Sequence, residues 1–324
     1  GRNGLDANWT ATNEAWRFVP AGTSITSLAW HEGSGTSGPI IGTTDVINVC
    51  PAVTTTYTAE ITYTLCDGST LIETEETTVT VNGAKVWNGS VSTDWNVANN
   101  WTPTGIPTAS DCVVIPDTAN DPIVSGTNYN GLGLNLTIQN NAILNVTSNN
   151  AVTITDWVNI NAGGDLQLND SASLIQINNN ANTGTMHMDR TTFIRKLDYV
   201  YWSSPVAAFN VSNLPNSLRY IWNTTIANTN GGQGNWVAAG GNMVAGKGYI
   251  ARASNGSATP IATTTSFVGV PNNGVINMPI LRGSYQGADY AGTNGITITR
   301  FSDNWNLVGN PYPSSINVED FLNL

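Results

Sequence analysis

The chain has 324 residues, of which only 10% are charged, and its 11 basic and 22 acidic residues give a net charge of −11. Average globular proteins carry roughly 25% charged residues, so long surface helices joined by Glu–Lys pairs are excluded. Nucleic-acid binding needs many basic side chains against the phosphates, and the one tight basic cluster is Arg190, Arg195 and Lys196. No run of about 18 apolar residues occurs, which argues against membrane insertion.

Thr, Asn, Gly and Ser take the place of the missing charged residues. Thr favours strands, whereas Asn and Gly favour turns, so the composition predicts an all-β, extracellular protein. Three cysteines are too few for a disulfide-rich scaffold. The chain opens without a Met or an apolar signal segment and stops inside an expected helix. We therefore expect an internal fragment of a longer secreted chain.

The region over 20–82 alternates apolar and polar residues between turns. A Gly-rich loop is expected over 33–38 and a hairpin turn at Asp67-Gly68. Short strands joined by such turns predict a small Ig-like sandwich. Strands are expected over 24–30, 45–50, 56–65 and 71–81. Acids on a solvated edge discourage pairing with other strands, and three are expected there: Glu73, Glu75 and Glu76.

Cys50 and Cys66 are the candidate disulfide. Their bridge would contribute about 3 kcal/mol in the chain-entropy model. A straight strand over 56–65 spans roughly 30 Å and would carry Cys66 away from Cys50, so pairing and non-pairing both stay open. Cys112 lies on an apolar strand, where we expect a buried small side chain rather than a nucleophile.

Three tryptophans follow a short linker at 82–85: Trp87, Trp95 and Trp101. One interpretation is a platform on which sugar rings stack. The other is a buried cap over the end of the next domain, because an aromatic side chain buries about 150–250 Å² and small polar loops need such anchors. We favour the cap.

The segment over 136–177 contains a repeat of 22 residues. Each repeat has three short alternating strands separated by Asn-, Gly- and Ser-containing corners, and Asn suits corners because it tolerates left-handed backbone angles. This pattern is typical of a three-sided parallel β-solenoid, in which each coil stacks on the next. With two clear coils and an irregular earlier one, residues 83–189 predict a short, Trp-capped solenoid. The shift aligns Leu136 with Val158, Leu144 with Leu166 and Val152 with Leu174.

Residues 190–324 form the last region, for which we expect a β-sandwich module; a jelly roll is one arrangement consistent with its strands. Ser314 and Ser315 lead into a helix with Glu319 and Asp320 in its first turns, and the module is expected to be cut within this helix. Strands are expected over 198–205, 217–222, 248–252, 266–270, 295–300 and 305–309.

Motifs for catalysis are missing or incomplete. Neither His31 nor His187 belongs to an HExxH or CxxC pattern, and no GxSxG nucleophile motif occurs. The segment 241–248 resembles a phosphate-binding loop, but Gly248 replaces its hydroxyl residue and a strand is expected to follow. We expect no catalytic residue and no cofactor. A loop that contains Asp111, Asp117 and Asp121 is a candidate calcium site. A metal site at Glu73, Glu75 and Glu76 is the alternative to a solvated edge for those three acids.

One group of motifs is distinctive: Trp87-x-Gly89-x-x-Ser92-x-Asp94-Trp95, Asn100-Trp101, Asp111-Cys-Val-Val-Ile-Pro116, Tyr201-Trp-Ser-Ser-Pro205, Gly246-Lys-Gly-Tyr249 and Trp305-Asn-Leu-Val-Gly-Asn-Pro-Tyr-Pro-Ser314. These motifs resemble modules of very large secreted surface proteins of Bacteroidetes. The resemblance covers 85–324 and implies substrates of the type IX secretion system, gliding-motility adhesins among them. It therefore implies contact with the outer-membrane translocon or shuttle of that system. Residues 1–19 resemble the closing strands of a lectin-like domain.

These observations favour a non-catalytic stalk or adhesin segment at the cell surface. The alternative is a carbohydrate-binding accessory region of a secreted polysaccharide-degrading enzyme, with surface glycans as partners of the tryptophans. A third reading is cargo bound to its secretion machinery. Solenoid lyases and hydrolases need clustered carboxylates or a Lys or Arg base. The coils lack Lys and Arg from 116 to 188 and hold three acids: Asp156, Asp165 and Asp170.

Overall fold

The computed structural model divides into two compact units, Gly1–Ala84 and Lys85–Leu324. Strands make up 45% of the structure and helices 4%, which confirms the all-β class. The segment 1–19 lies outside the described residues. No helix in the described part of the chain is long and apolar enough to cross a membrane. The structure describes residues 24–47, 49, 51, 54–79, 84–215, 218–228, 232–253, 256–283, 288–291, 297–299 and 305–323.

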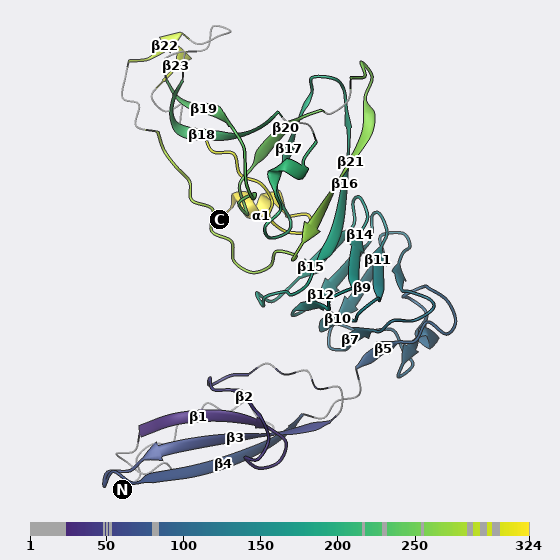
Figure 1. Cartoon of the computed structure of the whole chain (residues 1–324), viewed down its shortest axis with the longest axis vertical. Coiled ribbons are helices and arrows are strands. Elements are labelled where there is room, and N and C mark those ends of the chain that lie inside the picture. The colour runs from purple at the N-terminus through teal and green to yellow at the C-terminus, as the bar shows by residue number, and fades with distance from the viewer. Residues whose placement is uncertain are drawn as a thin grey trace. The chain divides into compact units, whose positions relative to one another are not determined.

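The first unit contains a four-stranded antiparallel sheet in the order β2-β1-β3-β4 (Figure 1). The predicted hairpin turn is confirmed, because Gly68 has a φ of 81° and the carboxylate of Asp67 accepts a hydrogen bond from the Ser69 N–H. Within 24–79, the described strands form this single sheet. Its strands are β1 (Ser24–Glu32), β2 (Ile40–Gly42), β3 (Thr55–Thr64) and β4 (Thr70–Val79).

The strand expected over 45–50 is wrong for its described residues, and β2 pairs with β1 in its place. The Thr44 carbonyl accepts a hydrogen bond of 2.9 Å from Trp30 Nε1, which ties the chain to the sheet just before this segment. Val46 and Ile47 then line a cavity of about 250 Å³ together with Trp30 and Tyr57. The alternating apolar residues therefore contact a sheet face instead of forming a ladder.

The acidic strand is confirmed as an edge, because β4 ends the sheet. Glu76 has a specific role there. Its Oε1 accepts hydrogen bonds from Ser34 Oγ at 2.7 Å and from the Gly35 N–H at 2.8 Å, and these bonds hold the pKa of Glu76 below its ordinary value. The carboxylate thus fastens the loop over 33–38 to the edge strand.

We predict that Glu76→Gln weakens the acid dependence of folding. A carboxyl whose folded-state pKa is lowered contributes stability above its unfolded pKa, and that contribution disappears as the pH falls through the folded value. Urea unfolding between about pH 6 and pH 3 should therefore show a smaller loss of stability in Glu76→Gln than in the unmodified chain. Glu75→Gln is the matched control, and an equal change in that variant would contradict the assignment.

The second unit begins with a three-sided parallel β-solenoid of about four turns, seen as stacked strands in Figure 1. One side contains β5 (Lys85–Trp87), β7 (Cys112–Ile115), β10 (Asn135–Ile138) and β13 (Val158–Ile160), with β6 (Trp101–Thr102) antiparallel to β5. The second contains β8 (Ile123–Val124), β11 (Ile143–Val146), β14 (Asp165–Leu168) and β16 (Met186–Ile194). The third contains β9 (Asn130–Gly133), β12 (Ala151–Ile154) and β15 (Ser173–Gln176).

The 22-residue repeat is confirmed pair by pair. Leu136 lies beside Val158, Leu144 beside Leu166, and Val152 beside Leu174 in parallel register. The corners repeat as well, since the left-handed residues Asn141 and Asn149 are matched 22 positions later by Gly163 and Ser171. The irregular earlier coil indicated by the sequence consists of β7, β8 and β9. The sequence did not reveal its third strand, because β9 carries Gly131 and Gly133 where β12 carries Val152 and Ile154.

The solenoid core continues into the C-terminal region. Met186 and Met188 of β16 extend the inner rows of β14, and β16 then pairs antiparallel with β21 (Ile261–Gly269) over nine residue pairs. One buried cluster therefore runs from Trp87 to Phe267. The boundary expected between 189 and 190 falls inside β16, because this strand belongs to both regions.

A second C-terminal sheet has the order β17-β20-β18-β19 and is formed by β17 (Tyr199–Trp202), β18 (Arg219–Asn228), β19 (Gly232–Ala238) and β20 (Tyr249–Arg252). The strand expected over 305–309 is reduced to one bridge between Lys247 and Val308. The predicted helix is α1 (Val318–Leu322), and its cap is Asn317 rather than a serine. The remaining elements are η1 (Ala98–Asn100), η2 (Val211–Asn213), β22 (Tyr290–Ala291) and β23 (Thr297–Ile298).

We predict that removal of one whole coil preserves the fold. Deletion of residues 143–164 joins Ala142 to Asp165, which pairs with Ile143 in the intact solenoid and can take its place. Because each coil contacts only its neighbours, the shortened solenoid should still unfold cooperatively, at a lower Tm. Circular dichroism should keep its β signature.

Deletion of residues 143–153 is the control. It removes half a repeat and places corners against strands, so this variant should not fold. Equal behaviour of the two deletions would contradict the solenoid register.

Candidate functional site

The three predicted tryptophans form a closed cluster at the start of the solenoid. Trp87, Trp95 and Trp101 are 1%, 0% and 1% exposed. The Trp101 ring lies 5.0 Å from that of Trp87 and 4.7 Å from that of Trp95, and both pairs are edge to face. Such geometry is favourable between aromatic quadrupoles. The cluster therefore covers the end of the core, and the stacking platform is wrong because the rings are inaccessible to a sugar.

Polar groups around the cluster hold its loops in place. The indole of Trp87 donates to the Asn120 carbonyl at 2.7 Å, and that of Trp101 donates to the Trp95 carbonyl at 2.9 Å. Asn100 is completely buried, accepts hydrogen bonds from two backbone N–H groups, and donates to the Asp94 carbonyl and Ser92 Oγ. The Asn100 side chain therefore supplies hydrogen-bond partners to backbone groups of the loop between β5 and η1.

Glycine is needed beneath the cluster. A Cβ added at Gly131 would lie 3.1 Å from the Trp95 ring. Because buried interiors have no spare volume, a larger residue at this point would push the ring outwards. Packing of Trp95 therefore favours glycine at position 131.

We predict that Trp101→Ala destabilises the chain by about 3–5 kcal/mol, the usual range for loss of a buried large aromatic side chain. The ring contacts both other tryptophans, so its removal opens a cavity at the end of the core. Thermal and urea unfolding measure the effect. Val91→Ala, at a 60% exposed position of the same loop, should change stability little. An equally small effect at Trp101 would contradict the structural role.

The remaining predicted site residues are not assembled into one site. Cys50 lies outside the described residues, and Cys66 is exposed. Cys112 is disulfide-bonded, so it is not the simple buried thiol that we expected. Three cysteines allow one bridge within a chain, so an intrachain bridge at Cys112 excludes the candidate pair of Cys50 and Cys66.

The calcium candidates serve separate hydrogen bonds. Asp111 accepts from Thr108, Asp117 from Asn141, and Asp121 from the Ile143 N–H. Among the described residues, no group of three metal-ligating side chains comes together.

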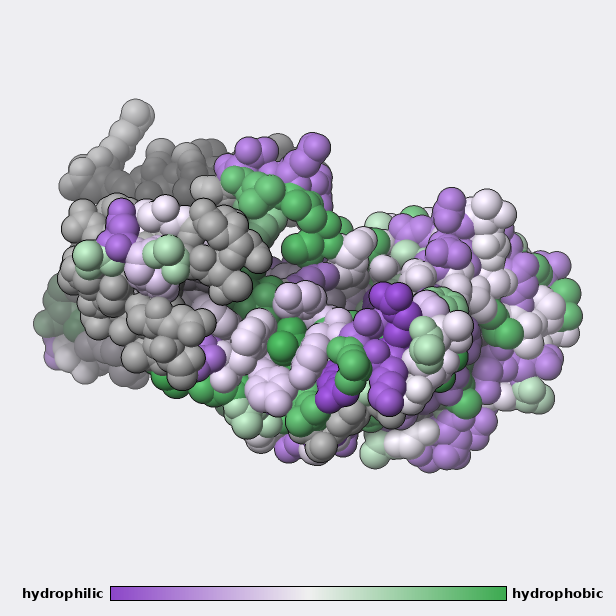
Figure 2. All heavy atoms as spheres, turned by 90° about the horizontal axis from the view of Figure 1, so that it is seen from above, coloured by the Kyte–Doolittle hydropathy of each residue, from purple (hydrophilic) through white to green (hydrophobic). Residues whose placement is uncertain are grey.

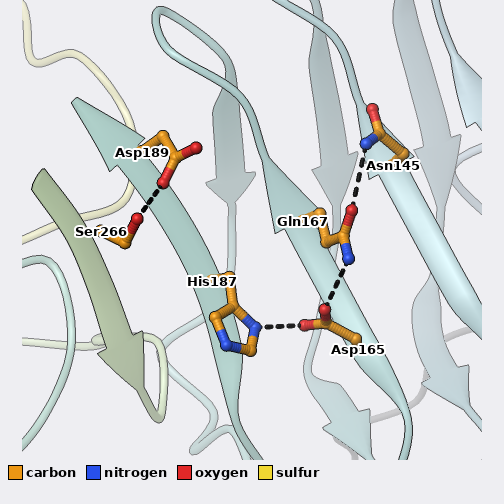
Figure 3. A network of polar contacts seen from close by, with 6 residues as sticks. All are labelled: Asn145, Asp165, Gln167, His187, Asp189 and Ser266. Atoms are coloured by element: carbon orange, nitrogen blue, oxygen red, sulfur yellow. Dashed lines mark hydrogen bonds and ion pairs between the residues drawn. The ribbon is translucent and has the colours of Figure 1, made fainter. Parts of the chain in front are cut away.

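A polar network crosses the outer face of the second solenoid side (Figure 3). His187 Nδ1 lies 2.6 Å from one carboxylate oxygen of Asp165, and Gln167 donates to the other at 2.8 Å. Asn145 donates to Gln167 at 3.2 Å. The four side chains come from β11, β14 and β16, so the network connects three successive strands of the stack.

This network can orient an imidazole, but none of the described residues places a nucleophile in hydrogen-bond contact with it. His187 is 47% exposed. Figure 3 shows Ser266 turned to Asp189, to which it donates a hydrogen bond, and not to His187. A nucleophilic relay requires the hydroxyl to contact the imidazole. The arrangement instead adds side-chain hydrogen bonds to the stacked ladder. Sequence analysis missed it, although Asp165 and His187 are separated by the repeat length of 22.

A cleft of about 390 Å³ lies between β16 and β17 and is lined in part by the segment 307–314. Arg190 contributes a half-buried guanidinium, which donates to the carbonyls of Asp189 and Ala172. Burial lowers the pKa of Arg190, while the charges of Asp170 and Asp189 raise it. The arginine is thus used to tie β16 to a solenoid corner.

Comparison with known proteins gives one match. A family described as a domain of unknown function, DUF8693, matches residues 86–324. The chain belongs to this family. No curated protein and no solved structure matches the chain. The DUF8693 match begins one residue after the first residue of the second unit, Lys85. The family region therefore contains the Trp cap, the solenoid and the C-terminal sheets as one body.

Proposed function

We propose that this chain is a non-catalytic stalk or adhesin segment of a large secreted cell-surface protein, which spaces and presents other domains. The observation that carries the proposal is the continuous solid core of the second unit. One row of buried side chains crosses five strands of a single sheet without interruption: Val124, Val146, Leu168, Met188 and Phe267. A filled rod of this kind suits a spacer, because close-packed interiors resist deformation.

The contacts of the three carboxylates in the coils support the same proposal. In the coils, Asp165 contacts His187 and Gln167, Asp156 contacts Asn180, and Asp170 accepts from the Thr191 N–H. Each carboxylate is therefore engaged in holding neighbouring strands or turns. Glycoside hydrolysis needs two carboxylates that face each other across a substrate.

The surface chemistry supports an extended scaffold. Figure 2 shows hydrophilic, near-neutral and hydrophobic residues mixed over short distances on the visible face. The polar groups of Asn, Thr and Ser can hydrogen-bond to water, so such a surface is hydrated without ion pairs.

The proposal includes export by the type IX secretion system, a Bacteroidetes source and a role in surface adhesion or gliding motility. It rests on the motif resemblance over 85–324. The alternative function, a carbohydrate-binding accessory region of an enzyme, relied on sugar rings stacking on the three tryptophans. Those rings are buried, so they do not support it.

Surface labelling tests this proposal. Antibodies raised against the purified chain should label intact cells of the source organism. Labelling should disappear in a strain that lacks the type IX outer-membrane translocon, while the protein accumulates inside the cell. Purified chain should release no product from a panel of polysaccharides and peptides. Detection only inside unmodified cells, or turnover that copurifies with the chain, would overturn the proposal.

A further inference from the structure

The sheet β17-β20-β18-β19 has two faces of different chemistry. One face enters the core through Trp202, Tyr249 and Ala251, which are all buried. Because side chains alternate across a strand, the neighbouring residues occupy the opposite face. That opposite face, which we term the aromatic face, carries Tyr199, Tyr201, Tyr220, Trp222 and Trp236.

The strand register brings these rings together. Tyr201 lies opposite Ile250, which pairs with Tyr220 on the next strand, and Trp222 lies opposite Trp236. The ring centroids of Tyr199 and Tyr220 are 6.3 Å apart, and those of Trp222 and Trp236 are 5.3 Å apart. These contacts restrain the rings before any ligand arrives.

The outer rings stay open to solvent. Tyr199, Tyr201 and Trp236 are 43%, 67% and 37% exposed, although Ile250 on the same face is buried. Exposed apolar groups that gather on one face mark interaction sites more often than scattered ones. The aromatic face therefore has both preorganised and accessible rings, unlike the Trp cap.

A local positive charge adjoins the aromatic face. Arg252 lies directly opposite Tyr199 in the register, and Lys196 lies in the turn before β17. The one acid of that turn, Asp198, is paired with Arg195 at 3.3 Å. Within the described part of the chain, the charged groups of Arg252 and Lys196 make no ion pair. In a chain with net charge −11, this spot is suited to an anionic ligand.

We propose that the aromatic face binds acidic polysaccharides of the polyuronate class. Sugar rings offer apolar faces to aromatic side chains, and Tyr and Trp combine a large apolar surface with a polar group. A uronate carboxylate matches the planar guanidinium of Arg252. Nucleic acid fits less well, because it needs a track of cations along successive phosphates. This inference goes beyond the spacer role and is independent of the export route.

Calorimetric titration of the purified chain with polygalacturonate tests the proposal. We expect saturable binding that weakens with salt. Tyr201→Ala and Trp236→Ala should each raise the Kd roughly tenfold, because exposed aromatic and arginine anchors dominate such surfaces. Arg252→Gln should raise the Kd and remove the preference for polygalacturonate over its neutral methyl ester.

Two matched variants control for general effects. Phe321→Ala removes an exposed aromatic ring of α1, and Lys85→Gln removes a cation at the start of the solenoid. Both should bind like the unmodified chain, and thermal unfolding verifies that every variant is folded. The proposal is overturned by an absence of binding, by equal affinity for the ester, by equal losses in the controls, or by tighter binding of oligothymidylate. Surface labelling is unaffected by these outcomes, so this inference and the proposed function fail separately.

Discussion

The structure of the second unit depends on in-register stacking of buried aliphatic side chains at a spacing of 22 residues. Leu144 above Leu166, and Val152 above Leu174, are completely or almost completely buried. Each coil exposes apolar rows at both ends and can bury them only against another coil. The stack consequently needs a cover at each end. The Trp cluster covers one end, and the strand pair β16 and β21 extends the other into the C-terminal sheets.

This constraint also explains the scarcity of charge. Inner positions must be apolar, corners must adopt left-handed backbone angles, and outer positions of neighbouring coils lie beside one another about 4.8 Å apart. Asn141 and Asn149 serve the corners, while Asn145 and Gln167 hydrogen-bond across coils. Like charges at such positions would repel along the stack. Short polar residues avoid that cost. The charged residues that remain, such as Asp165 and Arg190, are tied into local contacts.

The sequence predicted the features that depend on repeated local patterns. It did not predict the features that depend on contacts between segments far apart in the chain. The solenoid register, the hairpin at Asp67-Gly68 and the acidic edge strand followed from periodicity and turn chemistry. The segment 45–50 has strand-like alternation, but the hydrogen bond from Trp30 to Thr44 ties the preceding residue to β1, and Val46 and Ile47 line a cavity beside the sheet instead of pairing in it. The boundary near residue 190 was misplaced because β16 pairs with β14, 20 residues earlier, and with β21, about 75 residues later. A short window of sequence around residue 190 cannot contain both partner strands.

The sequence by itself determined the all-β class, the 22-residue coil and the residues able to form corners, because these depend on alternation and backbone preference within each repeat. Only the tertiary structure decided which aromatic residues are inside and which are outside. Trp95 and Trp236 have the same side chain, yet one is 0% exposed and the other 37%. The difference comes from what packs against each ring. The Trp95 ring lies against Gly131 and Trp101 within the core, whereas the Trp236 ring contacts Trp222 on the outer face of a sheet.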